Sequence, residues 1–141
     1  MMSSLLRILL ICLAVSLAVV SCRGSSEPEN PLVGNWEGDV EAMKELHPEL
    51  AESSMAPMIF SLMSSMKVEF TDERMTIDAM GNQQITAYKV ISTSDEEMII
   101  KPTEGKHAGT KTFVKFLPND RVQLSTENGE DSIMLLKRSS D

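Results

Sequence analysis

From Lys67 to the end of the chain, apolar and polar residues alternate with a period of two, and turn-forming residues interrupt the alternation about every 8–12 residues. A period of two places successive side chains on opposite faces of a β-strand. Together with an apolar segment at 32–39, the pattern predicts about eight short strands. The predicted fold is mainly β, either an antiparallel up-and-down barrel or a strongly curved meander. The expected strands after the first lie near residues 68–70, 75–79, 85–91, 98–101, 112–117, 122–126 and 132–137.

The period changes to three and four residues between the first and second expected strands, which predicts a helical insertion at about 40–66. Pro48 and Pro57 divide this segment, so we expect two short helices or one helix broken by proline. Pro57 suits a first helical turn, with Ser54 as a candidate cap. The residues that recur at helical spacing are Met55, Met58, Ile59, Leu62, Met63 and Met66.

The N-terminus combines one positive charge, Arg7, with the apolar run Ile8–Val20. This length fits the apolar region of a secretory signal, and it is shorter than the ~20 residues that span a bilayer. We therefore expect residues 1–21 to be a signal peptide. A plain signal peptide and an uncleaved signal anchor are the alternatives.

The signal ends in Val19-Val20-Ser21-Cys22, which resembles the lipobox of bacterial lipoproteins. The resemblance implies that the Cys22 thiol receives a diacylglyceryl group, that cleavage occurs before Cys22, and that the freed amine is acylated as well. It thus implies a membrane-anchored protein of the cell envelope. Arg23 follows the anchor in place of Asp, which favours the outer membrane, on its periplasmic or surface face, if the source is Gram-negative.

The predicted organisation is a signal peptide at 1–21, a lipidated polar tether at 22–31 and one folded domain at 32–141. The chain has a net charge of −8, which argues against nucleic acid as a partner. It has two cysteines, one in the signal and the other at the lipidation position. The mature domain should therefore lack a disulfide and thiol chemistry.

The segment Gly34-Asn35-Trp36 resembles the Gly-x-Trp signature in the first strand of lipocalins and of small lipocalin-like bacterial domains. The resemblance implies that Trp36 closes one end of a barrel. It also implies that a basic side chain from the last strand lies across the indole ring. Lys137 and Arg138 are the candidates for this partner.

Catalytic and metal signatures do not emerge. His47 and His107 lack the spacing of a zinc site, and the acidic clusters fall at expected turns. Methionine pairs could bind Cu(I), but the apolar residues between them favour packing or an adaptable apolar surface. We therefore expect no enzyme activity, catalytic residue, metal or cofactor.

Two functions are left open by the sequence. The first is a lipocalin-like module that binds a small apolar ligand between the Met-bearing helix and the sheet. The second is a protein-interaction or structural lipoprotein, such as an inhibitor or assembly accessory, with a filled barrel. The expected partners are the membrane, through acyl chains on Cys22, and a small apolar ligand or an envelope protein. The possible ligand-lining residues are Met55, Met58, Ile59, Leu62, Met63, Phe70, Ile77, Tyr88 and Phe113.

Overall fold

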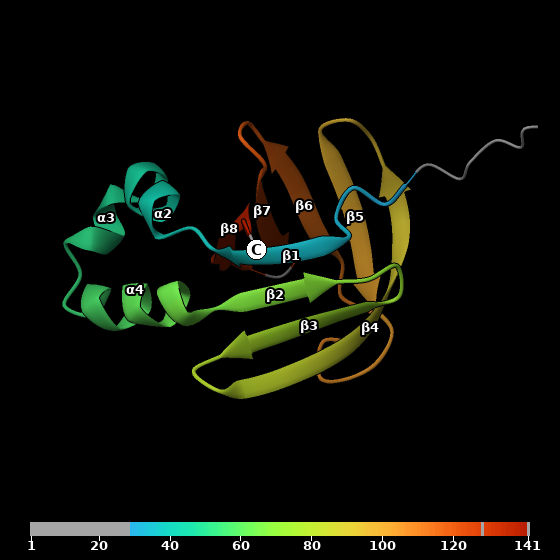
Figure 1. Cartoon of the computed structure of the whole chain (residues 1–141), viewed down its shortest axis with the longest axis horizontal. Helices are drawn as coiled ribbons and strands as arrows, with labels where there is room; N and C mark the ends of the chain where they lie inside the picture. The colour runs from blue at the N-terminus through green and yellow to red at the C-terminus, as the bar shows by residue number, and fades with distance from the viewer. Residues whose placement is uncertain (1–28, 128, 141) are drawn as a thin grey trace, which may run out of the picture. The chain divides into compact units, whose positions relative to one another are not determined.

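In the computed structural model, eight antiparallel strands form a closed barrel in the order β1 to β8 (Figure 1). The structure describes residues 29–127 and 129–140. Pro31–Asp141 forms one compact unit. The predicted signal peptide, Cys22 and most of the tether lie outside the described residues.

Each strand pairs with its neighbour in the chain, and β1 pairs with β8 to close the barrel. The predicted up-and-down barrel is therefore confirmed. The strands are β1 (Gly34–Gly38), β2 (Lys67–Phe70), β3 (Arg74–Ala79), β4 (Asn82–Thr93), β5 (Glu97–Pro102), β6 (Thr112–Leu117), β7 (Arg121–Thr126) and β8 (Gly129–Arg138).

The insertion after β1 is helical, as predicted, but it contains three helices. They are α2 (Val40–Leu46), α3 (Pro48–Ala51) and α4 (Ala56–Ser65). Prolines occupy the first turns of α3 and α4, where the missing N–H costs no helical hydrogen bond. The predicted cap at Ser54 is wrong, because Met55 is the cap residue of α4 and its N–H donates to the Ser53 hydroxyl.

The interior of the barrel is filled with large apolar side chains. Alternation along each strand turns one side chain in two inward, and cross-strand pairs such as Val114–Leu124 and Val122–Leu136 share this interior face. The buried cluster consists of Leu32, Trp36, Met66, Val68, Phe70, Tyr88, Met98, Ile100, Val114, Val122, Leu124 and Leu136, with Met75, Ile77, Phe116 and Met134 packed against it.

The β3–β4 hairpin turns at Met80–Gly81, where both residues have positive φ. Asn119 and Asp120, in the turn between β6 and β7, also have positive φ.

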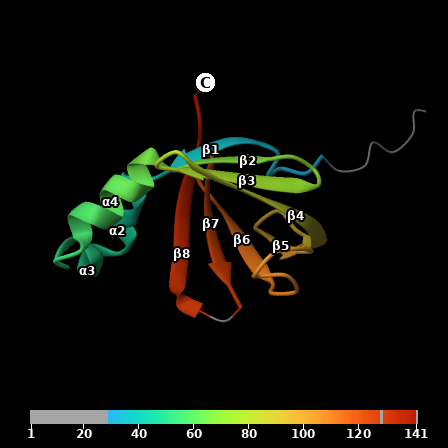
Figure 2. The same ribbon diagram turned by 90° about the horizontal axis from the view of Figure 1, so that it is seen from below.

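The helices lie on one side of the barrel, and β4 and β5 lie on the other (Figure 1 and Figure 2). A second apolar cluster joins the helices to the outer wall. It consists of Ala42, Met43, Met63 and Leu135, with Val40, Leu50, Ile59, Phe60 and Leu117 packed against it. The helical insertion therefore covers part of the barrel wall, and the interior is a separate cluster.

Candidate functional site

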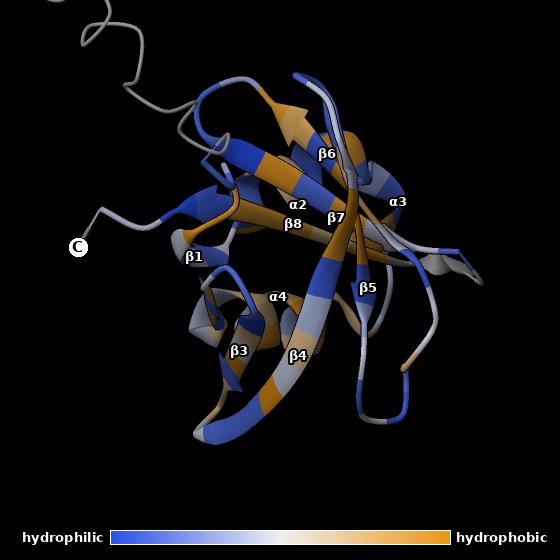
Figure 3. Ribbon diagram, turned by 90° about the vertical axis from the view of Figure 1, so that its right-hand side faces the viewer, coloured by the Kyte–Doolittle hydropathy of each residue, from blue (hydrophilic) through white to orange (hydrophobic). Residues whose placement is uncertain are grey.

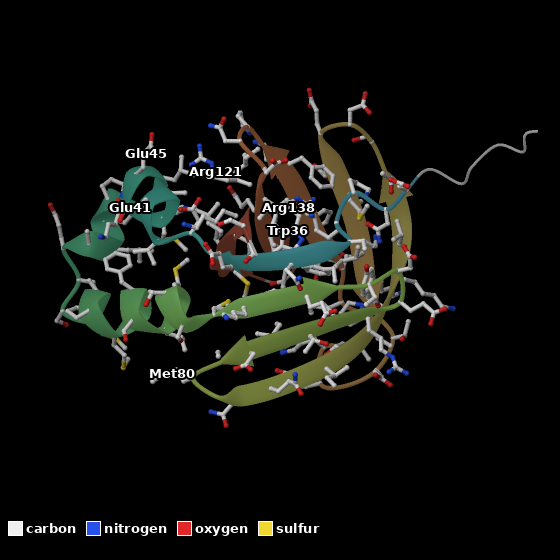
Figure 4. The ribbon with its side chains drawn as sticks, in the orientation of Figure 1. Trp36, Glu41, Glu45, Met80, Arg121 and Arg138 are labelled. Atoms are coloured by element: carbon white, nitrogen blue, oxygen red, sulfur yellow. The ribbon has the colours of Figure 1, made fainter. Side chains whose placement is uncertain are left out.

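Trp36 of β1 and Arg138 of β8 lie side by side (Figure 4). The guanidinium carbon of Arg138 lies 4.3 Å from the centre of the Trp36 ring, within cation–π range. Trp36 is 2% exposed, and its Nε1 donates to the Leu32 carbonyl at 2.7 Å. The predicted basic partner from the last strand therefore lies over the indole ring, whereas closure of one barrel end by Trp36 stays a prediction.

Arg138 also binds the segment that leads into β1. Its two terminal nitrogens donate to the carbonyls of Val33 at 3.1 Å and Pro31 at 3.0 Å. A Cβ at Gly34 would lie 2.6 Å from Arg138 Nη1, so the absence of a side chain there lets the guanidinium approach the backbone. The predicted alternative, Lys137, instead forms an ion pair with Glu37 at 3.3 Å.

Three of the possible ligand-lining residues, Phe70, Ile77 and Tyr88, belong to the interior cluster. The rings of Phe70 and Tyr88 meet edge to face, with centroids 6.0 Å apart. The Tyr88 hydroxyl donates to the Thr71 carbonyl, so its polar end is satisfied. These side chains fill the barrel and contact one another.

Phe113 is the remaining strand residue among the possible ligand-lining residues, and the expectation that it faces the interior is wrong. Phe113 pairs with Ile99 and Ser125, whereas its neighbour Val114 pairs with the buried Met98 and Leu124. Alternation therefore turns Val114 inward and Phe113 outward. The error is a shift of one residue in the phase of β6.

The methionine stripe predicted along one helical face divides between two faces of α4. Ile59 and Met63 face the barrel wall and belong to the second cluster. Met55, Met58 and Leu62 face solvent and are 53%, 61% and 41% exposed. The nine possible ligand-lining residues therefore occupy separate places and do not line a common pocket.

The buried face of α4 is held against the barrel by close backbone packing at Gly38. A Cβ at this position would lie 2.1 Å from the Met63 carbonyl oxygen. The Gly38 N–H donates to the Met66 carbonyl at 3.2 Å. Leu135 also contributes to this packing. It points outward from β8, is covered by the helices and is 1% exposed.

Asp39 and Arg121 fix the start of α2, a role that sequence reasoning missed. Asp39 is buried, and its Oδ1 accepts the Ala42 N–H at 3.0 Å as a helix cap. Its Oδ2 lies 3.9 Å from Nη1 of Arg121, which extends from the start of β7 toward α2 (Figure 4). An Asp directly after a strand and three residues before Ala42 was the available signal.

The outward face of α4 is the most unusual surface of the helical insertion. No charged residue occurs from Met55 to Met66. Surface helices normally carry charged side chains on the face that meets water. Here that face presents Met55, Met58 and Leu62 together with serines, so it is an uncharged apolar surface about three turns long.

The pockets found among the described residues are open to solvent and have mixed or polar linings. One of about 300 Å³ lies along β1, β2 and β3 and includes Asn35, Lys67 and Asp78. Another of about 340 Å³ lies at the β4–β5 hairpin and includes Glu96 and Lys115. Neither adjoins the exposed methionines of α4.

Groups of three or more metal-ligating side chains do not occur among residues 29–127 and 129–140. His47 Nδ1 lies 3.1 Å from the Glu49 carboxylate. The pKa of Glu49 is lowered, mainly by its backbone hydrogen bond and further by His47. His47 lies at the junction of α2 and α3, and Glu49 lies in the first turn of α3.

No known family model matches the chain, and no curated protein matches it significantly. Within the part of the chain that the structure describes, no helix has the length and hydropathy needed to cross a bilayer.

Proposed function

We propose that this protein is a lipid-anchored lipoprotein of the cell envelope that binds another envelope protein through the outward face of α4. The barrel acts as a rigid scaffold for this face, and acyl chains on Cys22 hold the protein at the membrane. If the source is Gram-negative, the outer membrane is the expected location.

The lipid anchor is supported by the sequence around Cys22, where a short apolar run ends in a small residue and a cysteine. Two or three acyl chains hold a protein stably, because each buried CH₂ contributes ~0.8 kcal/mol and a single chain binds only marginally. The polar residues 23–31 then serve as a tether between the membrane and the barrel.

Protein binding is favoured over small-ligand binding because the interior is filled and the apolar surface is external. The single observation that carries the proposal is the exposure of Met55, Met58 and Leu62 on a helical face without charge. Exposed apolar patches on soluble domains are typical of interaction sites. Unbranched methionines adapt to an irregular partner surface, so we expect the partner to present apolar side chains.

The anchor is tested by replacing Cys22 with Ala in the source organism or a related bacterium. We expect C22A to lose labelling by radioactive palmitate and to leave the membrane fraction. The matched control is C12A, since Cys12 lies within the predicted signal and should leave labelling unchanged. Palmitate labelling that persists in C22A would exclude this anchor.

The partner surface is tested by placing a photo-crosslinking residue at Met58 in living cells. We expect one discrete adduct that disappears when Met55→Glu and Leu62→Glu are added, while the circular dichroism stays unchanged. A crosslinker at Asp72, an exposed position in the β2–β3 loop, is the control and should give no such adduct.

Two outcomes would contradict the protein-binding proposal. One is the absence of an adduct at Met58, or an adduct that persists after both Glu substitutions. The other is a lipid-sized mass that stays bound to the purified domain in native mass spectrometry, because it would indicate a ligand inside the barrel.

A further inference from the structure

Three lysines form a row across the outer wall of β4, β5 and β6. Lys89 pairs directly with Lys101 in the β4–β5 register. Lys111 immediately precedes β6, and the last β5–β6 pair is Ile100–Thr112, so one further step of the register brings Lys111 to the level of Lys101. The adjacent pair Tyr88–Pro102 is buried, so alternation turns Lys89 and Lys101 outward.

Like charges directly opposite each other on neighbouring strands are destabilising. Among the described residues, no carboxylate lies within 4.0 Å of the ammonium groups of Lys89, Lys101 or Lys111. The nearby carboxylates of Glu104 and Glu127 accept backbone N–H groups from Ala87 and Lys111. Within the part of the domain that the structure describes, these three lysines therefore form no ion pair.

An apolar row lies beside the lysines on the same wall. Ile99 pairs with Phe113, and both are half-buried and point outward. Ile91 is the unpaired residue of a β-bulge between the pairs Val90–Ile100 and Ser92–Ile99, and it is 52% exposed. In Figure 3 the strands of this wall alternate between hydrophilic and hydrophobic residues along their length.

The charge of this wall differs from that of the whole chain, whose net charge is −8. Lys115 lies on the same face, and the acidic residue paired with it in the register is Glu97. With Glu97, Glu104 and Glu127 set against Lys89, Lys101, Lys111 and Lys115, the wall carries a small excess of lysine beside its partly exposed apolar side chains. Surfaces of this composition bind the headgroup region of membranes that contain anionic lipids.

We propose that the wall formed by Lys89, Lys101, Lys111, Ile91, Ile99 and Phe113 docks on the surface of an anionic phospholipid bilayer. This inference rests on the lipid anchor of the proposed function. The tether of residues 22–31 spans at most about 35 Å, so the anchor keeps the wall at a high local concentration near the bilayer. Charge complementarity and apolar contact then fix one orientation of the barrel.

The docked orientation has a consequence for α4. The helices lie on the side of the barrel opposite β4 and β5 (Figure 1 and Figure 2). When the lysine wall faces the bilayer, the helical side is turned away from it. The exposed methionines of α4 would then be accessible to a partner in the aqueous compartment.

The experiment uses the acylated protein purified from membranes and reconstituted into two kinds of vesicle. One contains phosphatidylcholine alone, and the other contains phosphatidylcholine with about one quarter phosphatidylglycerol. An environment-sensitive fluorophore is attached to I91C, and the control label is attached to S61C on α4. Brominated lipids report contact between each label and the bilayer.

We expect quenching of the I91C label in the anionic vesicles and little quenching in the neutral ones. High salt should reverse it, and the S61C label should stay unquenched. K89Q, K101Q and K111Q together should lower the docked-to-free ratio by roughly a hundredfold. The matched triple variant K44Q, K67Q and K137Q has the same net charge and should retain docking.

Several outcomes would overturn the docking proposal. They are equal quenching in both vesicles, docking that survives the K89Q, K101Q and K111Q changes, or quenching that appears only when an acidic protein is added. Failure of the anchor is distinguishable, because a protein without acyl chains would not float with the vesicles of phosphatidylcholine alone.

Discussion

Two parts of the barrel wall carry outward-facing apolar residues, but these residues are buried in one part and partly exposed in the other. On the β6–β8 side, Leu117 and Leu135 pack against α2 and α4, and Leu135 is almost completely buried. On the β4–β6 side, Ile99 and Phe113 are half-buried beside lysines. The chain covers one apolar wall with its own helical insertion and leaves the other partly exposed.

Leu135→Ala should have the largest effect on stability of the changes considered for these walls. We expect it to lower the free energy of unfolding by about 3 kcal/mol, because it opens a cavity beneath the helices. Phe113→Ala, on the uncovered wall, should cost about 1 kcal/mol. Chemical denaturation measures both, and equal losses would contradict the distinction between the walls.

Gly38→Ala should displace α4 from the covered wall. The new Cβ would overlap the backbone of Met63, so we expect a loss of about 2 kcal/mol. Hydrogen exchange should become faster at the amides of α4 and stay slow in β5 and β6. Unchanged protection of α4 would mean that the helix does not depend on this close contact.

Lys89→Thr should raise the free energy of unfolding by about 0.5 kcal/mol, because it removes one of two like charges that face each other. Lys67→Thr is the matched control on another wall. Lys67 pairs with Glu37 and Asp78 in the register, so its loss should lower stability by a similar amount. Thermal unfolding at low salt measures both, and a destabilising Lys89→Thr would contradict the repulsion.

The strands could be predicted because apolar and polar residues alternate clearly in most of them, a pattern that is typical of strands with one buried face. The phase of β6 could not, since Phe113, Val114, Phe116 and Leu117 put apolar residues on both of its faces. Helix α4 has the same ambiguity, because its apolar residues cover both the packed and the exposed face. Periodicity alone does not distinguish which of two apolar faces is buried.

The lysine row is formed by cross-strand register, and the sequence alone does not reveal it. The Trp36–Arg138 contact was anticipated through a family resemblance that specifies a partner in the last strand. Lys89, Lys101 and Lys111 are separated by ten or more residues and become neighbours only through the β4–β5 and β5–β6 registers. Their separation in the chain hides the local charge within an acidic sequence.

The contact between Arg138 and the backbone of Val33 joins groups 105 residues apart. Closing so long a loop is slow, and the contact cannot form until the last strand has been synthesised. During synthesis, the edge of β1 that pairs with β8 therefore remains unpaired until β8 has been made. Loss of the last few residues would leave that edge unpaired and prone to pairing with other chains.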